Sequence, residues 1–240
     1  FRRENGIEGP SWLLKIGLWI VTKLATLLAH IVIVHEPFLK KNLVDDYGVH
    51  RDKIEIIPHG VEDAEPIPKD KAREKLGFRG KKIILFFGYL TGYKGLELLI
   101  EAYRHVNNRI NGTILVIAGG EHPRLKHKPW YQQWLNQLIQ KAEMVRQELK
   151  GRGEILFTGY IPEENIPIYY SAADIIALPY IARISESVPE ALAIAFSKLM
   201  ILTNPNSSNS LHNPKILAEK IFSILHNPDL SHKLVRQNQQ

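Results

Sequence analysis

Short apolar runs that alternate with longer amphipathic segments constrain the fold of this chain more than any other feature. The clearest case is residues 82–103, KIILFFGYLTGYKGLELLIEAY, where the apolar run 83–87 stops at Gly88. After a short loop, apolar residues recur at helical spacing from Leu96 to Tyr103. Because this alternation continues along the chain, the sequence predicts an α/β fold in which helices cover both faces of a parallel sheet.

The alternation divides the chain into a partial unit before about residue 64 and a complete unit after it. Residues 61–69 are acidic and contain proline, which is typical of a linker. The expected helices cover residues 11–29, 37–47, 70–76, 95–107, 129–149, 163–171, 187–196 and 214–225, with one more after the Asn-Pro-Asp break at 227–229. The expected strands cover residues 31–34, 54–57, 83–87, 113–118, 154–157, 174–178 and 199–202. Since such sheets bind ligands at the carboxyl ends of their strands, we expect the site there.

The segment 82–103 itself suggests what that site binds. A strand that breaks at glycine and continues as a helix leaves free backbone N–H groups at the helix start, where the partial positive charge suits a phosphate. Lys94 adds a mobile cation at the same place. The segment therefore predicts a nucleotide or phosphosugar site, and the alternative is an ordinary turn in which Gly88 serves geometry alone.

Composition excludes several other kinds of site. The chain of 240 residues has no cysteine, which rules out disulfides, thiolate catalysis and cysteine-bound zinc. Its hydrophobic fraction of 45% is enough for one large α/β domain or for one domain and part of another. The net charge of +6 suits anionic ligands such as nucleotides or lipid head groups. The basic residues are spread out, without a run interleaved with aromatics, so no nucleic-acid partner is expected.

The stretch 11–34, SWLLKIGLWIVTKLATLLAHIVIV, is apolar enough to raise the question of a membrane span. Lys15, Lys23 and His30 oppose that interpretation, because a lysine near the bilayer centre costs roughly 2.5–3.5 kcal/mol. We expect a buried helix followed by a core strand in preference to a membrane-contacting helix, and a single-pass span least of all.

Two features suggest that residues are missing from the sequence. The chain opens on Phe1 without an initiator methionine, as a fragment would. Residues 203–213, TNPNSSNSLHN, form a polar run of low complexity, which is either a loop or a junction between separated segments.

Several segments, in this order, resemble one family. They are VHEPFLKKNLVDDYGV, KIEIIPHGV, AREKLGF, ILFFGYLTGYKGLELLIEAY, LVIAGG, ILFTGYIPEENIPIYYSAADIIALPY and PEALAIAF. Together they resemble the C-terminal half of retaining glycosyltransferases of the GT-B fold, of the group 1 or family 4 type. The resemblance covers about residues 31–202, and residues 214–236 are similar to the family's C-terminal helices.

The resemblance implies a division into domains. The family has two Rossmann-like domains, of which the C-terminal one holds a nucleotide-diphosphate sugar and the N-terminal one most of the acceptor site. Residues 1–62 would then be the end of the acceptor domain with the crossover linker, residues 63–225 the nucleotide-sugar-binding domain, and residues 226–240 a C-terminal helix. Most of the N-terminal domain would be missing, so we expect this chain to bind a donor without efficient transfer.

The resemblance also implies which residues contact the donor. They are Gly88, Tyr89, Lys94, Gly120, Tyr160, Ile161, Ser187, Val188 and Glu190. Lys94 would contact the diphosphate, and Glu190 would accept hydrogen bonds from the ribose. Tyr89 stands where the family has an arginine, and Ala182 stands where it has the first glutamate of a pair, so the catalytic residue is unknown.

Other polar residues have simpler interpretations. Glu186 is expected to be a first-turn acid that complements the helix dipole. His35 and His59, at strand ends, are more often structural than catalytic, and Asp45 with Asp46 is expected to be solvated. No Asp-x-Asp motif occurs, so neither a metal nor a cofactor is expected.

The resemblance implies a hexosyltransferase that takes its sugar from a UDP- or GDP-linked donor and retains the anomeric configuration. The acceptor would be a carbohydrate or lipid-linked molecule. The expected location is the cytoplasm, and peripheral contact with the inner face of the membrane is an additional hypothesis based on residues 11–29. The alternatives are a catalytically degenerate nucleotide- or sugar-phosphate-binding module, and another GT-B enzyme such as an NDP-sugar epimerase.

Overall fold

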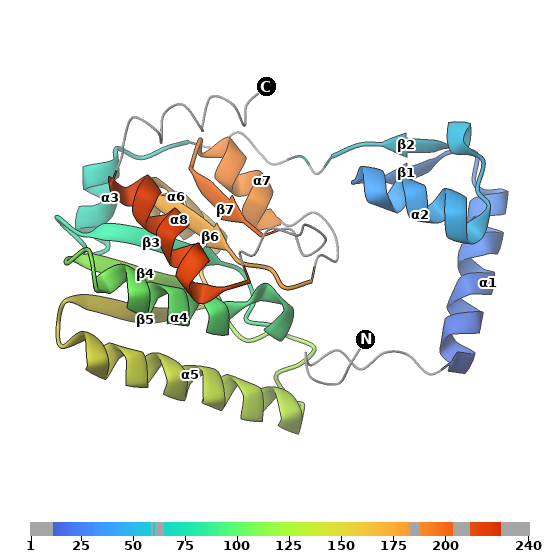
Figure 1. The fold of residues 1–240 in the computed structure, drawn as a ribbon. Coiled ribbons are helices and arrows are strands. Elements are labelled where there is room, and N and C mark those ends of the chain that lie inside the picture. Colours follow the sequence, from blue (N-terminus) through green and yellow to red (C-terminus); the bar gives the residue numbers. More distant parts are fainter. Residues whose placement is uncertain (1–11, 59, 61–64, 183–187, 204–211, 227–240) are drawn as a thin grey trace. The chain divides into compact units, whose positions relative to one another are not determined.

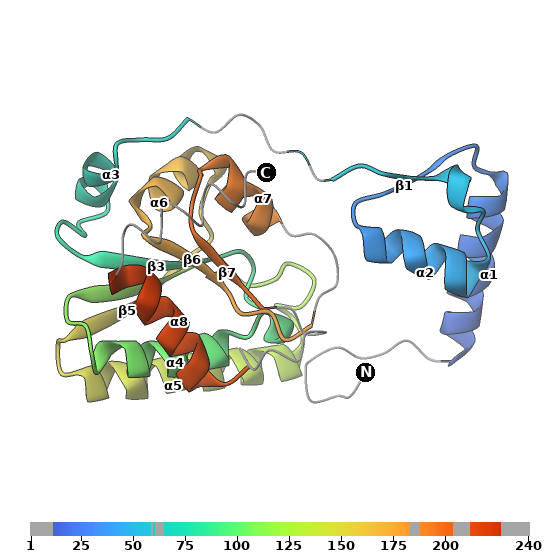
Figure 2. The ribbon, with the colours of Figure 1, turned by 45° about the horizontal axis from the view of Figure 1, so that its top comes forward.

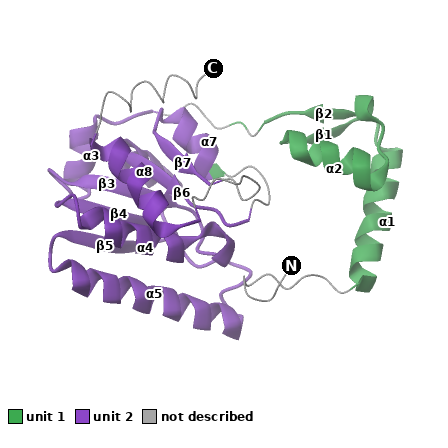
Figure 3. Ribbon diagram, in the orientation of Figure 1, with its two compact units in different colours: residues 1–60, 184–188 green, residues 61–183, 189–240 purple. Residues whose placement is uncertain are grey.

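The computed structural model of the chain describes residues 12–58, 60, 65–182, 188–203 and 212–226. It divides into two compact units (Figure 3). Unit 1 comprises residues 1–60 and 184–188, and unit 2 comprises residues 61–183 and 189–240. Each unit is described by itself.

Unit 2 contains the parallel sheet that the alternation predicts (Figure 1). Its strands are β3 (Lys82–Phe87), β4 (Thr113–Ala118), β5 (Gly153–Gly159), β6 (Ile175–Leu178) and β7 (Met200–Leu202). Their order in space is β5-β4-β3-β6-β7, and all four pairings are parallel. The chain therefore runs outward from β3 to β5 and resumes on the other side of β3 at β6. This change of direction places the topological switch point between the carboxyl ends of β3 and β6.

Helices cover both faces of this sheet, which confirms the predicted fold class (Figures 1 and 2). Along β3, Ile84 and Phe86 belong to one buried cluster, and Ile83 and Leu85 belong to another. This alternation follows from the period of two in a strand. The first cluster includes side chains of α4 (Leu96–Asn107), α5 (Pro129–Leu149) and α8 (Pro214–His226). The second includes side chains of α3 (Lys69–Lys75), α6 (Ile166–Ala172) and α7 (Val188–Ala195).

Unit 1 consists of α1 (Trp12–Leu28), β1 (Val32–Val34), α2 (Pro37–Tyr47) and β2 (Ile54–Ile56), with β1 and β2 paired in parallel. The helix α2 ends as the sequence predicts, at Gly48. This glycine has φ +63°, and its N–H donates to the carbonyl of Val44 at 3.0 Å. A left-handed glycine of this kind is a common helix end.

The expectation of a buried helix at residues 11–29 is wrong, and the core strand expected after it is buried only at Val34. The helix α1 forms, but Thr26 is its one buried residue, and Ile33 in β1 is 58% exposed. The other large apolar side chains of α1 are exposed: Trp12, Leu13, Leu14, Ile16, Leu18, Trp19, Ile20, Val21, Leu24, Leu27 and Leu28. The physical reason is that the two-stranded sheet of unit 1 offers too little surface to cover them. No described helix is long and apolar enough to cross a membrane.

Element boundaries differ from the predicted ones in small ways. The strand expected at residues 154–157 extends over Gly153–Gly159, and the helix expected at 163–171 opens with a 3₁₀ turn at Glu163–Asn165. Similar 3₁₀ turns occupy Arg51–Lys53 and Gly92–Lys94. Part of the expected linker, the polar run 204–211 and the last expected helix lie outside the described residues.

Candidate functional site

The loop between β3 and α4 brings Lys94 back onto Gly88, as the sequence suggests. Gly88 has φ +114°, and a Cβ atom placed on it would lie 2.5 Å from the Nζ of Lys94. Gly95, at the start of α4, has φ +68°, and a Cβ atom there would overlap the carbonyl oxygen of Pro179, which follows β6. The loops after β3 and β6 therefore meet at the switch point, and both glycines are required by close approach as well as by φ.

Lys94 is a buried cation at this point. It is 7% exposed, and burial lowers the pKa of Lys94 to about 8. Its Nζ lies 5.9 Å from the centre of the Phe86 ring. Within the described ranges, the ammonium group has no ion pair and no hydrogen bond. Burial of most of this side chain disfavours its charged form, and an anion beside the ammonium group would offset that cost, so this position favours an anion.

The ends of β4 and β5 lie against the same loop. A Cβ atom on Gly119 would overlap the carbonyl oxygen of Gly88, and one on Gly120 would lie 3.2 Å from the Cβ of Tyr160. The side chain of Tyr160 is 67% exposed, whereas Ile161 is buried in the core. Glycine therefore permits three strand ends to meet, with an exposed tyrosine at one side of the junction.

The first turn of α7 completes this edge of the sheet. Pro189 Cγ would lie 3.4 Å from a Cβ atom on Gly88, and the hydroxyl of Tyr170 donates to the Pro189 carbonyl at 3.2 Å. Glu190 follows in the same turn and is 8% exposed, whereas Val188 is exposed. The predicted contact Ser187 and its neighbour Glu186 lie outside the described residues.

Both departures from the family pattern lie in these loops. Tyr89, in place of the arginine, is 40% exposed and contacts the ring of His122 edge-on, with 5.5 Å between ring centres. Ala182, in place of the first glutamate, follows Ile181, whose N–H donates to the Tyr93 carbonyl at 2.8 Å. The structure therefore puts uncharged side chains at both positions.

His122, which was not among the predicted contacts, also lies at this edge of the sheet. Its backbone N–H donates to the Tyr131 hydroxyl at 3.0 Å, and that hydroxyl donates to the Leu90 carbonyl at 2.9 Å. Burial lowers the pKa of His122, and the charges of Arg124 and Lys94 lower it further. A signal was available, because this histidine follows the Gly119-Gly120 turn at the end of a predicted strand.

The remaining polar candidates have structural partners. The Nδ1 atom of His35 donates to the Ile57 carbonyl at 2.8 Å, in the tautomer that this acceptor requires. Asp45 is exposed beside Lys41, and His59 lies outside the described residues. Among the described residues, no three or more His, Asp or Glu side chains are grouped to hold a metal.

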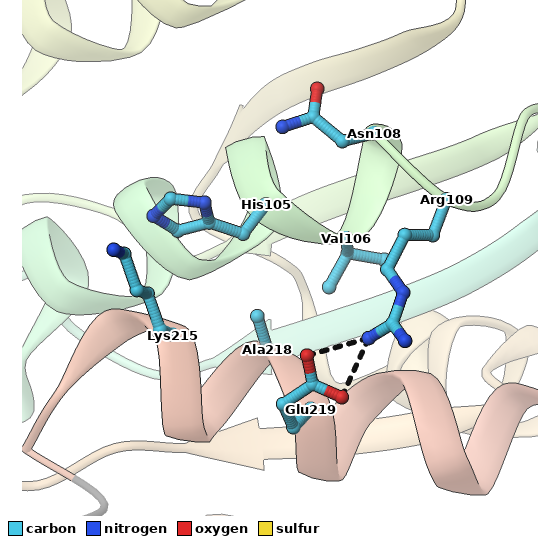
Figure 4. A pocket seen from close by; sticks show the side chains of 7 residues that line it. All are labelled: His105, Val106, Asn108, Arg109, Lys215, Ala218 and Glu219. Carbon is cyan, nitrogen blue, oxygen red and sulfur yellow. Dashed lines mark hydrogen bonds and ion pairs between the residues drawn. The ribbon is translucent and has the colours of Figure 1, made fainter.

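A surface hollow lies between α4 and α8, apart from the predicted contacts (Figure 4). It is lined by His105, Val106, Asn108, Arg109, Lys215, Ala218 and Glu219. One nitrogen of the Arg109 guanidinium donates to both carboxylate oxygens of Glu219 at 2.6 Å. Because this pair is already satisfied, the hollow is a weaker candidate for an anion than the loop around Lys94.

Two curated proteins with similar sequences are synthases of sugar-containing products. Mannosylfructose-phosphate synthase of Agrobacterium fabrum is 33% identical over 153 residues, which are 61% of this chain and 32% of that protein. Alpha-monoglucosyldiacylglycerol synthase of Streptococcus pneumoniae is 26% identical over 197 residues, which are 78% of this chain and 39% of that protein. The chain thus spans about a third of the length of the curated relatives it matches.

Solved structures agree on the fold. Anabaena HepE, in a crystal structure with UDP and glucose, superposes with a TM-score of 0.75 at 17% identity, over 94% of this chain and 61% of that one. The family model for glycosyl transferases group 1 matches residues 68–240, which is more than half of the chain. This chain therefore belongs to the group 1 glycosyltransferases.

Proposed function

We propose that the carboxyl edge of the sheet in unit 2 binds the diphosphate of a nucleotide-sugar donor. The observation that carries the proposal is Lys94, a largely buried lysine whose ammonium group lies against Gly88 at the switch point and has no described ion pair or hydrogen bond. A diphosphate beside it would restore the favourable electrostatics that burial removes. The crystal structure of HepE with UDP and glucose supports a nucleotide sugar as the ligand.

The same arrangement suits the departure of a nucleotide diphosphate. As the bond between sugar and phosphate breaks, negative charge grows on the leaving phosphate, and a preorganised cation lowers the barrier. Lys94 is already in place, and the backbone at Gly88 leaves room for close approach. In this proposal, Tyr89 contributes a hydroxyl hydrogen bond in place of the missing charge.

The other predicted residues keep the roles that the family resemblance implies for them. Glu190, in the first turn of α7, is proposed to hold the ribose, and Val188 and Ser187, of which Ser187 lies outside the described residues, stay predicted contacts of the diphosphate. Tyr160 and Ile161 at the end of β5 present their backbone to the base, and Gly120 keeps that turn close. No metal or other cofactor is part of the proposal.

We assign residues 63–225 to the nucleotide-sugar-binding domain and residues 1–62 to the acceptor side. The reaction is transfer of a hexose from a UDP- or GDP-linked donor, with retention at the anomeric carbon. One relative is named for a sugar phosphate and another for a diacylglycerol product, so both carbohydrate and lipid-linked acceptors remain in the proposal. The names of these relatives are those of synthases, which does not favour the epimerase alternative.

Calorimetric titration with UDP, GDP, ADP and their sugar conjugates tests the proposal. We expect one nucleotide family to bind, Lys94→Ala to weaken it at least tenfold, and Glu190→Ala to abolish the preference for ribose over 2′-deoxyribose. Glu219→Ala, an exposed glutamate on α8, is the matched control and should change nothing. Failure of every nucleotide to bind, or binding that Lys94→Ala leaves unchanged, would contradict the proposal.

A further inference from the structure

His122 occupies a fixed position beside the proposed diphosphate site. Its ring contacts Tyr89, the residue next to Gly88, and its backbone N–H is held by the hydroxyl of Tyr131 at 3.0 Å. Tyr131 is itself almost fully buried and bonded to the Leu90 carbonyl, so the loop after β4 is tied to the loop after β3. The imidazole is therefore positioned by two neighbouring elements and not by its own loop alone.

One ring nitrogen of His122 is already engaged. The backbone N–H of Arg124 donates to Nδ1 at 3.2 Å, so Nδ1 is the acceptor in the neutral ring and the proton lies on Nε2. Protonation would put a second N–H against that of Arg124, which disfavours the charged ring in the free protein. In the free protein, His122 therefore offers one neutral N–H donor and adds no second cation beside Lys94.

We propose that the imidazole of His122 binds the diphosphate of the donor together with Lys94, and so replaces the charged side chain that Tyr89 lacks. This inference rests on the proposed function of the site. The need is clear, because a tyrosine at position 89 supplies one hydrogen bond and no positive charge. A second donor can come from the loop after β4, where the ring of His122 lies against Tyr89.

Binding of a diphosphate by His122 should change the protonation of its ring. The groups that face His122 are Lys94 from the loop after β3, Arg124 from its own loop, Tyr89 and Tyr131. Glu121 precedes it in the chain, and its carboxylate accepts a hydrogen bond from Gln132. In the free protein, burial and the two cations keep the pKa of His122 below its ordinary value. A bound diphosphate reverses this balance and favours the imidazolium, so the complex takes up a proton in mildly acidic solution.

Titration calorimetry with UDP-glucose and GDP-mannose, in pairs of buffers with different ionisation enthalpies from pH 5.5 to 8, measures that proton uptake. Both phosphates of these probes are esterified, so the probes do not titrate in this range. We expect uptake by the wild-type protein near pH 6. His122→Gln keeps a neutral donor, so it should lose the uptake, weaken binding about tenfold at pH 6 and less than threefold at pH 8. His127→Gln, an exposed histidine on the same loop, is the control and should behave as wild type.

The outcomes separate this inference from the function on which it rests. Near pH 8, both proteins should take up a proton through Lys94, whose pKa in the free protein is about 8. If the wild-type protein binds a nucleotide sugar with no proton uptake near pH 6, or if His122→Gln retains the uptake near pH 6, His122 has no such role and the proposed function stands. If the wild-type protein binds no nucleotide sugar at any pH, both the role of His122 and the proposed function of the site are wrong. A His122→Gln protein that melts at the wild-type temperature shows that the loss is not one of folding.

Discussion

Unit 2 contains two lysines, Lys94 and Lys198, whose pKa values are lowered to the same extent but whose hydrogen bonds differ. Burial lowers the pKa of both Lys94 and Lys198 to about 8. The ammonium of Lys198 donates to the carbonyls of Ser171 at 2.9 Å and Ala173 at 3.2 Å, whereas that of Lys94 has no described acceptor. A shifted pKa alone therefore does not identify a functional lysine, and the state of its hydrogen bonds does.

The surroundings of Lys198 show what a structural arrangement looks like. Asp174 accepts hydrogen bonds from the side chains of Lys69 and Arg73 and from the N–H of Ile83, so α3, α6 and β3 are tied at one point. Lys198 closes the end of α6 beside this carboxylate. Around Lys94, the neighbours are instead glycines and aromatic rings, which leave space and supply no negative charge.

The largest effect is expected for Lys94→Met. We expect the affinity for the donor nucleotide to fall about 100-fold, since a charge-assisted hydrogen bond contributes about 1.5–3 kcal/mol. The unfolding free energy at pH 7 should not fall, because methionine removes a buried charge without leaving a broken hydrogen bond. Calorimetric titration and urea denaturation measure the two effects. If Lys94→Met lowers the unfolding free energy and leaves nucleotide affinity unchanged, Lys94 has a structural role like that of Lys198.

Lys198→Met should give the opposite result. Removing the ammonium leaves the carbonyls of Ser171 and Ala173 without this donor, which we expect to cost about 2 kcal/mol of unfolding free energy. Affinity for the nucleotide should stay within a factor of two of the wild-type value. Urea denaturation measures the unfolding free energy, and calorimetric titration measures the affinity. Strongly reduced nucleotide binding in a folded Lys198→Met protein would refute the assignment of this lysine to the structure.

Alkaline pH should stabilise the free protein through both lysines. Each pKa in the folded state, about 8, lies below the ordinary 10.5. Between these values the unfolded chain binds more protons, so stability rises with pH, by up to about 1.4 kcal/mol per pH unit for each lysine. Denaturation at pH 8 and 9.5 should show less of this rise in each methionine variant than in the wild type. Identical slopes in all three proteins would show that neither lysine is perturbed.

The smallest expected effect is an increase in donor affinity. Tyr89→Arg restores a cation beside Lys94, and we expect it to raise affinity for the donor about 3–10-fold at pH 7.5. Tyr89→Phe, which removes the hydroxyl and keeps the ring against His122, serves as its partner and should lower affinity by less than about threefold. Dissociation constants from the same titration compare them. A loss of affinity in Tyr89→Arg would place the diphosphate elsewhere.

Sequence reasoning predicts this fold well where the signal is local. The run that ends at Gly88 and the helical spacing after it predict β3 and α4, and strand ends rich in glycine predict the edge at which we propose that the ligand binds. It fails where contacts join distant residues. Nothing near Lys198 in the sequence reveals its bond to Ser171, and the apolar pattern of α1 does not reveal that its side chains remain exposed.

The most direct test is to follow Lys94 itself. Titration of the lysine side chains by NMR, with Lys94→Met and Lys198→Met proteins for assignment, gives both pKa values in the free protein and in the complex. We predict that UDP, or GDP if that is the preferred nucleotide, raises the pKa of Lys94 from about 8 towards its ordinary value of 10.5 and leaves that of Lys198 near 8. An unchanged pKa of Lys94 in a nucleotide-saturated protein would contradict the assignment of this lysine to the diphosphate.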